Sequence, residues 1–378
     1  MVNRTVVVTG MAWSTALGSE LDAVWRRLLA GDSGLRPVSS PYPLRNLRAA
    51  ALPGPPDGSP PDRRQVRLAV RTVTRALTDA RLDAGEQLLV AGTSYGAHLD
   101  DDGVPGLHQW AAETAAQVGL RRSPVSLSTA CSSGADVIAA GAALIQAGEA
   151  DTCVCAGVDI LTEAKRLGHS ALGTMSPSTL RPFDPSCDGT LLGEGAAAVV
   201  LETAAAARRR GAEVHATFRG AGAANDAAGL TAPDVSGDGV VLALSRSLAA
   251  AGADPDDVSV INAHGSGTPV NDTVEAASLD RVFATGGRRP VVFATKGAFG
   301  HTLGATGAIE AVALIKALQS GQVPPVVGLG QGVPPLSVLP VPAGVPRGIA
   351  SGLGVSLTLG FGGFNTSLVF EGTTGAAH

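Results

Sequence analysis

The sequence predicts an α/β fold of two pseudo-duplicated halves, with mixed sheets and buried helices between them. Runs of β-branched residues bounded by glycine alternate with alanine-rich stretches along the chain, which is typical of alternating strands and helices. The second half repeats the order of the first. In each half, the third strand leads into a helix rich in glycine and alanine and poor in charge, which favours burial on most sides. We therefore expect two related sheets packed through a shared helical layer.

The same patterns place the individual elements. In the first half, strands are expected near 5–9, 88–92, 124–127, 152–157 and 196–202, and helices near 19–30, 66–82, 107–119 and 131–148. In the second half, strands are expected near 214–219, 258–262, 290–294, 353–358 and 364–371, and helices near 236–252, 272–284 and 302–319. The stretches 37–64, rich in proline, and 322–347 are expected to be irregular. We divide the chain into an N-terminal half, 1–205, and a C-terminal half, 206–378.

Composition indicates a globular protein and argues against several classes of function. Hydrophobic residues make up 45% of the 378 residues and charged residues 16%, with a formal net charge of -5. The lysines and arginines are scattered, so no nucleic-acid partner is expected. Apolar runs such as "GAAAVVLE" are shorter than the roughly 18–20 residues that span a bilayer. The start, "RTVVVTG", lacks the pattern of a secretory signal, so we expect a cytoplasmic protein without membrane attachment.

One of the four cysteines is a candidate nucleophile. Cys131 lies in "STACSSG", where a predicted strand meets the start of a helix. The N–H dipoles at a helix start favour the thiolate and lower a thiol pKa that begins at about 8.5. Taken alone, a cysteine in such a place is more often structural than catalytic. Cys153 and Cys155 lie on an apolar strand and Cys187 in a polar loop, and none has a metal-ligand spacing with the histidines, so no metal is expected.

Two histidines lie in matching positions in the second half. His264 occurs in "NAHGSGTPVND" and His301 in "KGAFGHTLGATG". Each lies in a glycine-rich loop just beyond a predicted strand, where α/β sheets place their sites and where small residues let a substrate approach the backbone. A third glycine-rich segment, "GFGGFN" at 360–365, is either a tight turn or one side of an oxyanion hole. No nucleotide-binding motif occurs.

These motifs together resemble the β-ketoacyl-acyl carrier protein synthases, condensing enzymes with the thiolase-like fold. The resemblance begins at "VVVTGMAWSTALGSELDAVWRRLLAGDSGL" and ends at "GFGGFNTSLVFE", so it covers nearly the whole chain. Between these ends the family's motifs follow in order: "STACSSG", "RPFDPSCDGTLLGEGAAAVVLE", "NAHGSGTPVNDTVEA" and "KGAFGHTLGATGAIEA".

The resemblance implies a role for each residue of these motifs. Cys131 would take an acyl chain from the phosphopantetheine of an acyl carrier protein as a thioester. His264 and His301 would stabilise the enolate that forms as malonyl loses carbon dioxide, and its carbanion would attack the thioester. The backbone N–H groups of Cys131 and Phe361 would form the oxyanion hole, and Phe361 would also act as a gate, which the flanking glycines would allow to move. Lys296 would be a further catalytic residue.

The other matching positions would support this site. Lys296 would pair with Glu310, and Ser266 and Thr268 would hydrogen-bond the pantetheine arm. Ser266 replaces the family's usual threonine and keeps the hydroxyl. A set of acidic residues matches positions that mostly hold the surrounding loops, and we favour a structural role for them: Asp272, Glu275, Asp188 and Glu194. No cofactor is implied, because phosphopantetheine is carried by the acyl carrier protein.

The sequence also departs from the family pattern, and this leaves alternatives open. The segment between "VAGTSYG" and "STACSSG" is much shorter than in typical members, and it usually helps to build the dimer contact and the acyl pocket. Phe364 stands where many relatives have threonine. We expect a decarboxylating ketosynthase of a type II polyketide or fatty-acid-like specialised pathway. It would act as a homodimer or with a ketosynthase-like chain-length partner. The alternatives are acyl transfer without decarboxylation and a noncatalytic partner subunit.

Overall fold

Ten strands form one continuous mixed sheet in the part of the chain that the structure describes. The computed structural model describes residues 4–53, 59–95, 100, 106–284, 286–287, 289–330, 341–342 and 344–373. The spatial order of the strands is β10-β9-β13-β14-β8-β1-β7-β6-β4-β5. Their bounds are β1 (Val6–Ser14), β4 (Leu88–Gly92), β5 (Val125–Leu127), β6 (Thr152–Asp159), β7 (Gly195–Thr203), β8 (Ala216–Asn225), β9 (Val258–Asn262), β10 (Val291–Phe293), β13 (Leu353–Gly360) and β14 (Phe364–Gly372).

The sheet consists of two halves with the same internal order. Numbered along the chain within each half, both sets of five strands are arranged third, second, fourth, fifth, first. In both halves the second strand pairs in parallel with the third and fourth, and the fifth pairs antiparallel with the fourth and first. The halves join where β1 runs antiparallel to β8, with Val6 opposite Phe218. The predicted fold class and its repeat are therefore confirmed, but the expectation of two separate sheets was wrong, because the β1–β8 pairing joins the two halves into one sheet.

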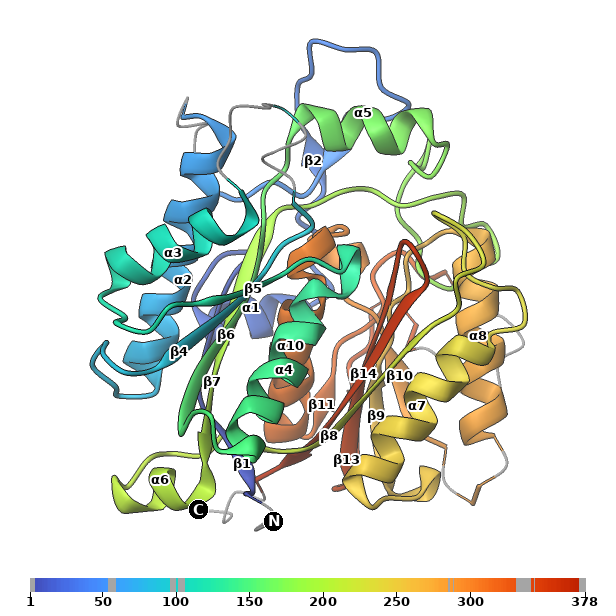
Figure 1. The fold of residues 1–378 in the computed structure, drawn as a ribbon. Helices are drawn as coiled ribbons and strands as arrows, with labels where there is room; N and C mark the ends of the chain where they lie inside the picture. The colour runs from blue at the N-terminus through green and yellow to red at the C-terminus, as the bar shows by residue number, and fades with distance from the viewer. Residues whose placement is uncertain are drawn as a thin grey trace.

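Two apolar helices lie between the halves, and other helices cover the outside (Figure 1). The central helices are α4 (Ser133–Ala147) and α10 (Thr306–Ser320). They approach so closely that a Cβ on Gly134 would lie 2.6 Å from the Ala308 nitrogen, and one on Gly307 would lie 2.4 Å from the Ala135 nitrogen. The glycine content of these two helices therefore has a structural reason, because a side chain at either position would collide with the backbone of the other helix. The outer helices are α2 (Pro61–Asp79) and α3 (Leu107–Val118) on one half, and α7 (Asp238–Ala251) and α8 (Pro269–Phe283) on the other.

The remaining elements are short, and most were not expected from the sequence. The helix predicted near 19–30 is α1 (Leu21–Leu29). The additional helices are α5 (Glu163–Ala171), α6 (Ala204–Arg209) and α9 (Lys296–Phe299), and the short strands are β2 (Arg36–Pro37), β3 (Arg48–Ala49), β11 (Gln322–Val323) and β12 (Arg347–Gly348). The division at 205 and 206 stays a prediction, and it would fall within α6. Much of the irregular segment 322–347, and part of the short segment before Cys131, lie outside the described residues.

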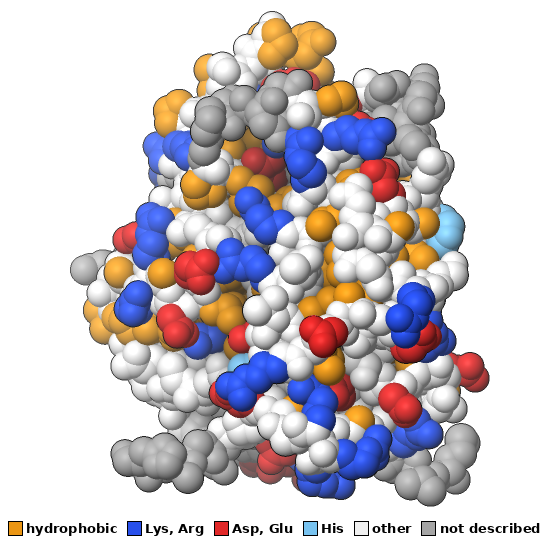
Figure 2. Space-filling model, turned by 90° about the vertical axis from the view of Figure 1, so that its left-hand side faces the viewer, with side chains coloured by type: hydrophobic (Ala, Val, Ile, Leu, Met, Phe, Trp, Pro, Cys, Tyr) orange, Lys and Arg blue, Asp and Glu red, His pale blue; other side chains and the backbone are white. Residues whose placement is uncertain are grey.

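Charged side chains of both signs lie on the surface, and one apolar helix has the composition of a membrane span. On the face drawn in Figure 2, the Lys and Arg side chains are interspersed with Asp and Glu, and no basic stripe is visible. Among the described residues, one helical stretch, Ala130–Ala147, has the length and hydropathy of a membrane span. No apolar run of this length was expected from the sequence. Most of that stretch is buried inside the protein, as expected for a core helix.

Equivalent turns in the two halves carry the candidate site residues. After β5, the short 3-10 turn Ala130–Ser132 leads into α4 and contains Cys131. After β10, α9 is followed by His301 and by the 3-10 turn Leu303–Ala305 that leads into α10. Ala130 and Leu303 take the same left-handed backbone conformation, with φ of 51° and 50°. Residues without a β-branch tolerate this conformation at a cost, so both turns are held by their surroundings.

Candidate active site

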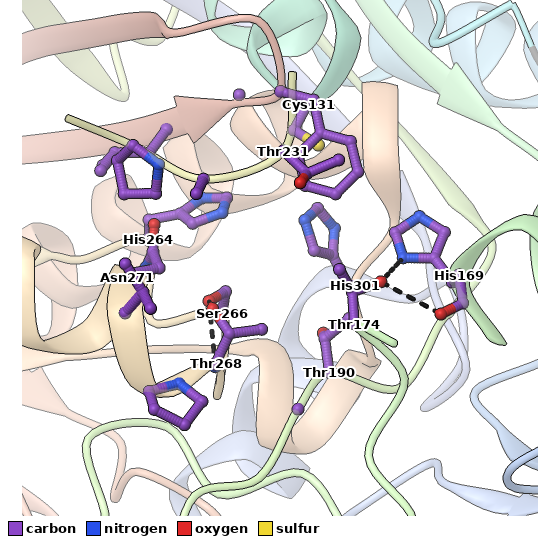
Figure 3. A pocket seen from close by; sticks show the side chains of 18 of the residues that line it. Cys131, His169, Thr174, Thr190, Thr231, His264, Ser266, Thr268, Asn271 and His301 are labelled. Carbon is purple, nitrogen blue, oxygen red and sulfur yellow. Dashed lines mark hydrogen bonds between the residues drawn. The ribbon is translucent and has the colours of Figure 1, made fainter. Parts of the chain in front are cut away.

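The predicted nucleophile and both predicted histidines line one cavity of about 190 Å³. Figure 3 shows Cys131, His264 and His301 converging on this cavity from three different turns. Ser266, Thr268, Asp188 and Phe361 also lie on its wall. The predicted site residues Lys296, Glu310, Asp272, Glu275 and Glu194 are not on the wall.

Cys131 is buried at the start of α4, with 3% of its surface exposed. Burial raises the pKa of its thiol to about 11, and the Phe361 backbone N–H and Lys296 oppose this rise only in part. The prediction that the helix start lowers this pKa below its usual value was therefore wrong. Loss of solvent penalises the thiolate more than the nearby dipoles favour it. The thiol is consequently protonated at rest.

The "GFGGFN" segment forms the tight turn between β13 and β14 and faces the nucleophile. Gly362 and Gly363 adopt φ of 80° and 79°, which side-chain-bearing residues rarely take. Gly363 donates its N–H to the Gly360 carbonyl oxygen at 3.1 Å and closes the turn. The Phe361 backbone N–H lowers the pKa of the Cys131 thiol, and both residues line the same cavity. An N–H group in this position can stabilise negative charge that develops at the nucleophile.

His264 is fixed in one tautomer by Lys296. The Lys296 Nζ lies 3.1 Å from the His264 Nδ1, and it also donates to the His264 carbonyl oxygen. An ammonium group can only donate, so Nδ1 must accept and the imidazole proton is on Nε2. Burial, the Lys296 charge and His301 hold the pKa of His264 well below its usual value. His264 is therefore a neutral imidazole with one N–H to offer a substrate.

His301 reaches the same state by a different contact. The Leu303 backbone N–H donates to the His301 Nδ1 at 3.1 Å, so the proton of this imidazole is also on Nε2. Burial, and to a lesser degree Lys296 and His169, hold its pKa well below the usual value. The His264 and His301 ring centroids are 5.3 Å apart at an angle of 77°. Two neutral N–H donors are thus placed beside each other on the cavity wall.

Lys296 and Glu310 form a buried ion pair behind His264. Their Nζ and Oε1 atoms are 2.7 Å apart, and each side chain is 1% exposed. Burial raises the pKa of Glu310 to about 7, and Lys296 is the largest influence that opposes this rise. Lys296 contacts His264 and does not line the cavity, and its predicted catalytic role stays a prediction.

The two hydroxyl residues predicted to hold the pantetheine arm lie at the cavity wall and contact each other. The Ser266 Oγ and Thr268 Oγ1 atoms are 2.7 Å apart. Behind them, Asp272 accepts hydrogen bonds from the Phe183 N–H at 2.8 Å and from the Gly267 N–H at 3.1 Å. Burial raises the pKa of Asp272, and these hydrogen bonds oppose that rise. The carboxylate ties the loop after β9 to the loop around Phe183.

Glu275 supports the His264 loop from the opposite side. Its two carboxylate oxygens accept the backbone N–H of His264 at 2.6 Å and of Gly265 at 2.8 Å. Burial raises the pKa of Glu275 to about 8, and the Gly265 N–H is the largest influence against this rise. Through these two hydrogen bonds to the backbone, Glu275 fixes the path of the loop that carries His264.

The last two predicted acidic residues brace more distant loops. Asp188 accepts hydrogen bonds from the Ser176 and Ser178 hydroxyls, each at 2.5 Å. Glu194 accepts from the Leu161 N–H at 3.0 Å and from Arg64 at 2.6 Å. Asp188 borders the cavity but Glu194 does not.

Two residues that the sequence analysis missed belong to the site and its support. His169, on α5, lines the cavity and stacks on the Phe361 ring, with centroids 5.5 Å apart at 24°. Asp159, at the end of β6, accepts the Ser94 N–H at 3.0 Å and the Gly304 N–H at 2.8 Å, and it pairs with the buried Lys165. Neither residue occurs in a motif with a recognised spacing, so no signal in the sequence singled them out.

The chemistry of the cavity is that of a thiol and neutral donors. Among the described residues, no group of three or more His, Cys, Asp or Glu side chains could hold a metal ion. All four cysteines are free thiols. A buried sulfur that faces two N–H-bearing imidazoles and a backbone N–H can form a thioester and stabilise an adjacent oxyanion.

Comparison with known proteins gives consistent matches over nearly the whole chain. Residues 3–207 match the model of the beta-ketoacyl synthase N-terminal domain, and residues 215–330 match that of the C-terminal domain. The 3-oxoacyl-[acyl-carrier-protein] synthase 2 of Mycobacterium bovis is 32% identical over 97% of this chain and 96% of its own length. A beta-ketoacyl synthase crystal structure from Burkholderia phymatum is 30% identical, with a TM-score of 0.87 over 98% of this chain and 100% of that one. The ishigamide ketosynthase/chain length factor structure is 28% identical, with a TM-score of 0.88 over the same shares.

Proposed function

The chain belongs to the β-ketoacyl synthase family, and on that premise we propose that it condenses an acyl thioester held on Cys131 with malonyl-acyl carrier protein. The reaction is a decarboxylative Claisen condensation that releases carbon dioxide and a 3-ketoacyl thioester. The pathway is of the type II polyketide or fatty-acid-like kind, and the site of action is the cytoplasm. The observation that carries this proposal is the convergence of the Cys131 thiol and two neutral imidazoles on one cavity.

The first half-reaction loads the acyl chain. The Cys131 sulfur attacks the carbonyl carbon of an acyl-phosphopantetheine thioester, and the pantetheine sulfur leaves. Because the thiol is protonated at rest, its proton passes to the departing pantetheine thiolate. The Phe361 N–H, the Cys131 N–H and the start of α4 stabilise the tetrahedral oxyanion. The pantetheine arm of the carrier protein lies against the Ser266 and Thr268 hydroxyls.

The second half-reaction forms the carbon–carbon bond. Malonyl-carrier protein binds with its thioester oxygen between the Nε2–H groups of His264 and His301. As the bond to the carboxylate breaks and carbon dioxide leaves, its electron pair moves into the enolate, which these two donors stabilise. Each preorganised donor of this type contributes about 3–4 kcal/mol to transition-state stabilisation. The enolate carbon then attacks the acyl carbonyl, and the Cys131 sulfur leaves and takes up a proton.

The charge balance of the cavity favours this role for the imidazoles. The low pKa of both histidines keeps their imidazoles neutral, and each neutral ring can donate one hydrogen bond to the substrate. Lys296 is paired with Glu310, so it fixes His264 without adding net charge to the site. Transfer of the acyl chain to another acceptor without decarboxylation would require neither this second donor nor its positioning.

The partners follow from the substrate and from the relatives. An acyl carrier protein delivers both substrates on phosphopantetheine, which belongs to the substrate and is not a resident cofactor. The chain acts as a homodimer or with a ketosynthase-like chain-length partner, and the solved structure of an ishigamide ketosynthase/chain length factor supports the second arrangement. Size measurement of the purified chain, alone and after co-expression with such a partner, distinguishes the two.

The proposal is tested with acyl-carrier protein and malonyl-carrier protein as joint substrates. The expected products are carbon dioxide and a 3-ketoacyl-carrier protein in equal amounts. The Cys131→Ala variant is expected not to condense the two substrates. Condensation that persists in Cys131→Ala would contradict the assignment of the nucleophile. Acylation of Cys131 without carbon dioxide release would instead identify an acyl-transfer enzyme.

A further inference from the structure

His169 has one ring nitrogen that the protein leaves without a hydrogen-bond partner. The residue lies on the cavity wall, with 8% of its surface exposed. Its Nδ1 is 2.9 Å from the Thr174 Oγ1, and the Thr174 hydroxyl also contacts the His169 carbonyl oxygen at 3.3 Å. Figure 3 shows these two contacts and the ring beside His301. No described residue contacts the Nε2 within hydrogen-bond distance.

The Thr174 contacts determine which ring nitrogen of His169 carries the proton. A carbonyl oxygen can only accept, so the Thr174 hydroxyl donates its one proton to the His169 carbonyl. The Thr174 oxygen must then accept from Nδ1–H for both contacts to be hydrogen bonds. Burial, and to a lesser degree Lys165, lower the pKa of His169 to about 4, so the ring is neutral at physiological pH. The free Nε2 is therefore an acceptor.

The position of this acceptor relates it to the acyl chain. The His169 ring stacks on Phe361, and His169, Phe361 and Cys131 all line the same cavity. His169 therefore borders the space next to the nucleophile. Water can satisfy the Nε2 while the cavity is empty. A saturated acyl chain would displace that water and leave a buried acceptor without a donor, which disfavours binding.

We propose that the His169 Nε2 accepts a hydrogen bond from a hydroxyl group on the acyl chain that Cys131 carries. The site then selects hydroxylated acyl chains over unsubstituted chains of the same length. This inference rests on the proposed function, because it assumes that Cys131 is acylated. Leaving one buried acceptor unpaired corresponds to a discrimination of about 5- to 100-fold.

The test is competitive loading of Cys131 by matched acyl-carrier proteins. The panel contains an unsubstituted chain, the same chain with a hydroxyl at C3 or at C5, and the 3-keto chain. Intact-protein mass spectrometry measures which chain is attached. We expect one hydroxylated chain to load about 5- to 100-fold faster than the unsubstituted one.

Two variants separate the acceptor from the shape of the ring. His169→Phe keeps an aromatic ring against Phe361 but removes the acceptor, so the hydroxyl preference should disappear. Thr174→Val removes the partner that fixes Nδ1–H, so the preference should fall while Cys131 still loads. Circular dichroism and thermal unfolding check that both variants are folded.

Each result bears on a defined claim. Equal loading of all chains, a preference for the 3-keto chain, or a hydroxyl preference that survives in His169→Phe would overturn the inference and leave the proposed function intact. Failure of every chain to acylate Cys131, with no carbon dioxide from malonyl-carrier protein, would contradict the proposed function, and the inference would fall with it.

Discussion

Replacement of Lys296 by methionine should reduce both stability and decarboxylation, for different reasons. Lys296 and Glu310 are 2.7 Å apart and each is 1% exposed, so the substitution leaves a buried carboxylate without its cation. Loss of one partner of a buried ion pair costs about 3–5 kcal/mol in the free energy of unfolding. The pKa of Glu310, already raised by burial to about 7, should rise further, because Lys296 is its main opposing influence.

The pH dependence of this loss has a defined sign. A carboxyl group whose pKa is higher in the folded state than in the unfolded state loses its contribution to stability as pH rises through the folded value. With Lys296 removed, protonated Glu310 is tolerated at low pH, but ionisation above neutral pH leaves an unpaired buried charge. The stability difference between the variant and the original protein should therefore grow as pH rises through and above 7.

The catalytic effect of the same change comes through His264. Without the Lys296 ammonium at 3.1 Å, the imidazole proton is free to occupy Nδ1, where it does not face the cavity. Complete removal of one oxyanion donor costs about 10²–10³ in rate, and partial loss of the correct tautomer should cost about 10- to 100-fold. The assay is carbon dioxide release from malonyl-carrier protein, measured beside urea unfolding.

Two controls separate the effects. Lys296→Met combined with Glu310→Met replaces the ion pair by apolar side chains and should recover stability without recovering the rate. Lys316→Met removes a lysine from a pair with the mostly exposed Asp22, 2.8 Å away, and should change stability by less than about 1 kcal/mol with no effect on rate. A wild-type rate in Lys296→Met, or recovery of the rate in the double variant, would refute this account of His264.

Three further predictions concern the nucleophile, the loop supports and the central helices. Because burial raises the pKa of Cys131 to about 11, its alkylation by iodoacetamide should accelerate about tenfold per pH unit between pH 7 and 10; a plateau reached below pH 8.5 would contradict this. Glu275→Ala and Glu194→Ala should each lower the free energy of unfolding by about 2–4 kcal/mol. Only Glu275→Ala should also lower the condensation rate, because Glu275 holds the backbone of His264 whereas Glu194 does not; equal rates in the two variants would argue against a role for Glu275 at the site. Gly307→Ala should lower the free energy of unfolding by about 1–3 kcal/mol or more, because the added methyl group forces α4 and α10 apart. The control is Gly168→Ala on α5, where the methyl group meets open space and thermal unfolding should show a neutral or slightly stabilising effect.

The main architecture could be predicted because its elements carry strong local signals. All ten strands of the main sheet and the long helices were expected near their positions, but β1 and β8 extend well beyond their predicted ends and α2 begins earlier than predicted. Fully buried strands are continuous apolar runs, and the central helices need glycine where their backbones touch at Gly134 and Gly307. The short helix α5 was missed because its buried residues are the polar Lys165, Arg166 and His169, so no row of apolar side chains marks it in the sequence.

The candidate site could be predicted in its members but only partly in its energetics. Cys131, His264 and His301 follow strand ends in small-residue loops, and the fold brings such ends together. The direction of the Cys131 pKa was not predictable, because it depends on how completely the assembled halves exclude water. The contacts of His169 with Phe361 and Thr174 join α5 to distant segments, and no sequence spacing records them.

The most direct test of the central claim is a single-turnover reaction of the acylated protein. Protein loaded with an acyl chain, with the chain located on Cys131 by peptide mass spectrometry, is mixed with malonyl-carrier protein labelled in the free carboxyl carbon. The account predicts one labelled carbon dioxide and one 3-ketoacyl-carrier protein for each acyl-Cys131 consumed. Consumption of acyl-Cys131 without labelled carbon dioxide, or labelled carbon dioxide with the acyl chain still on Cys131, would contradict it.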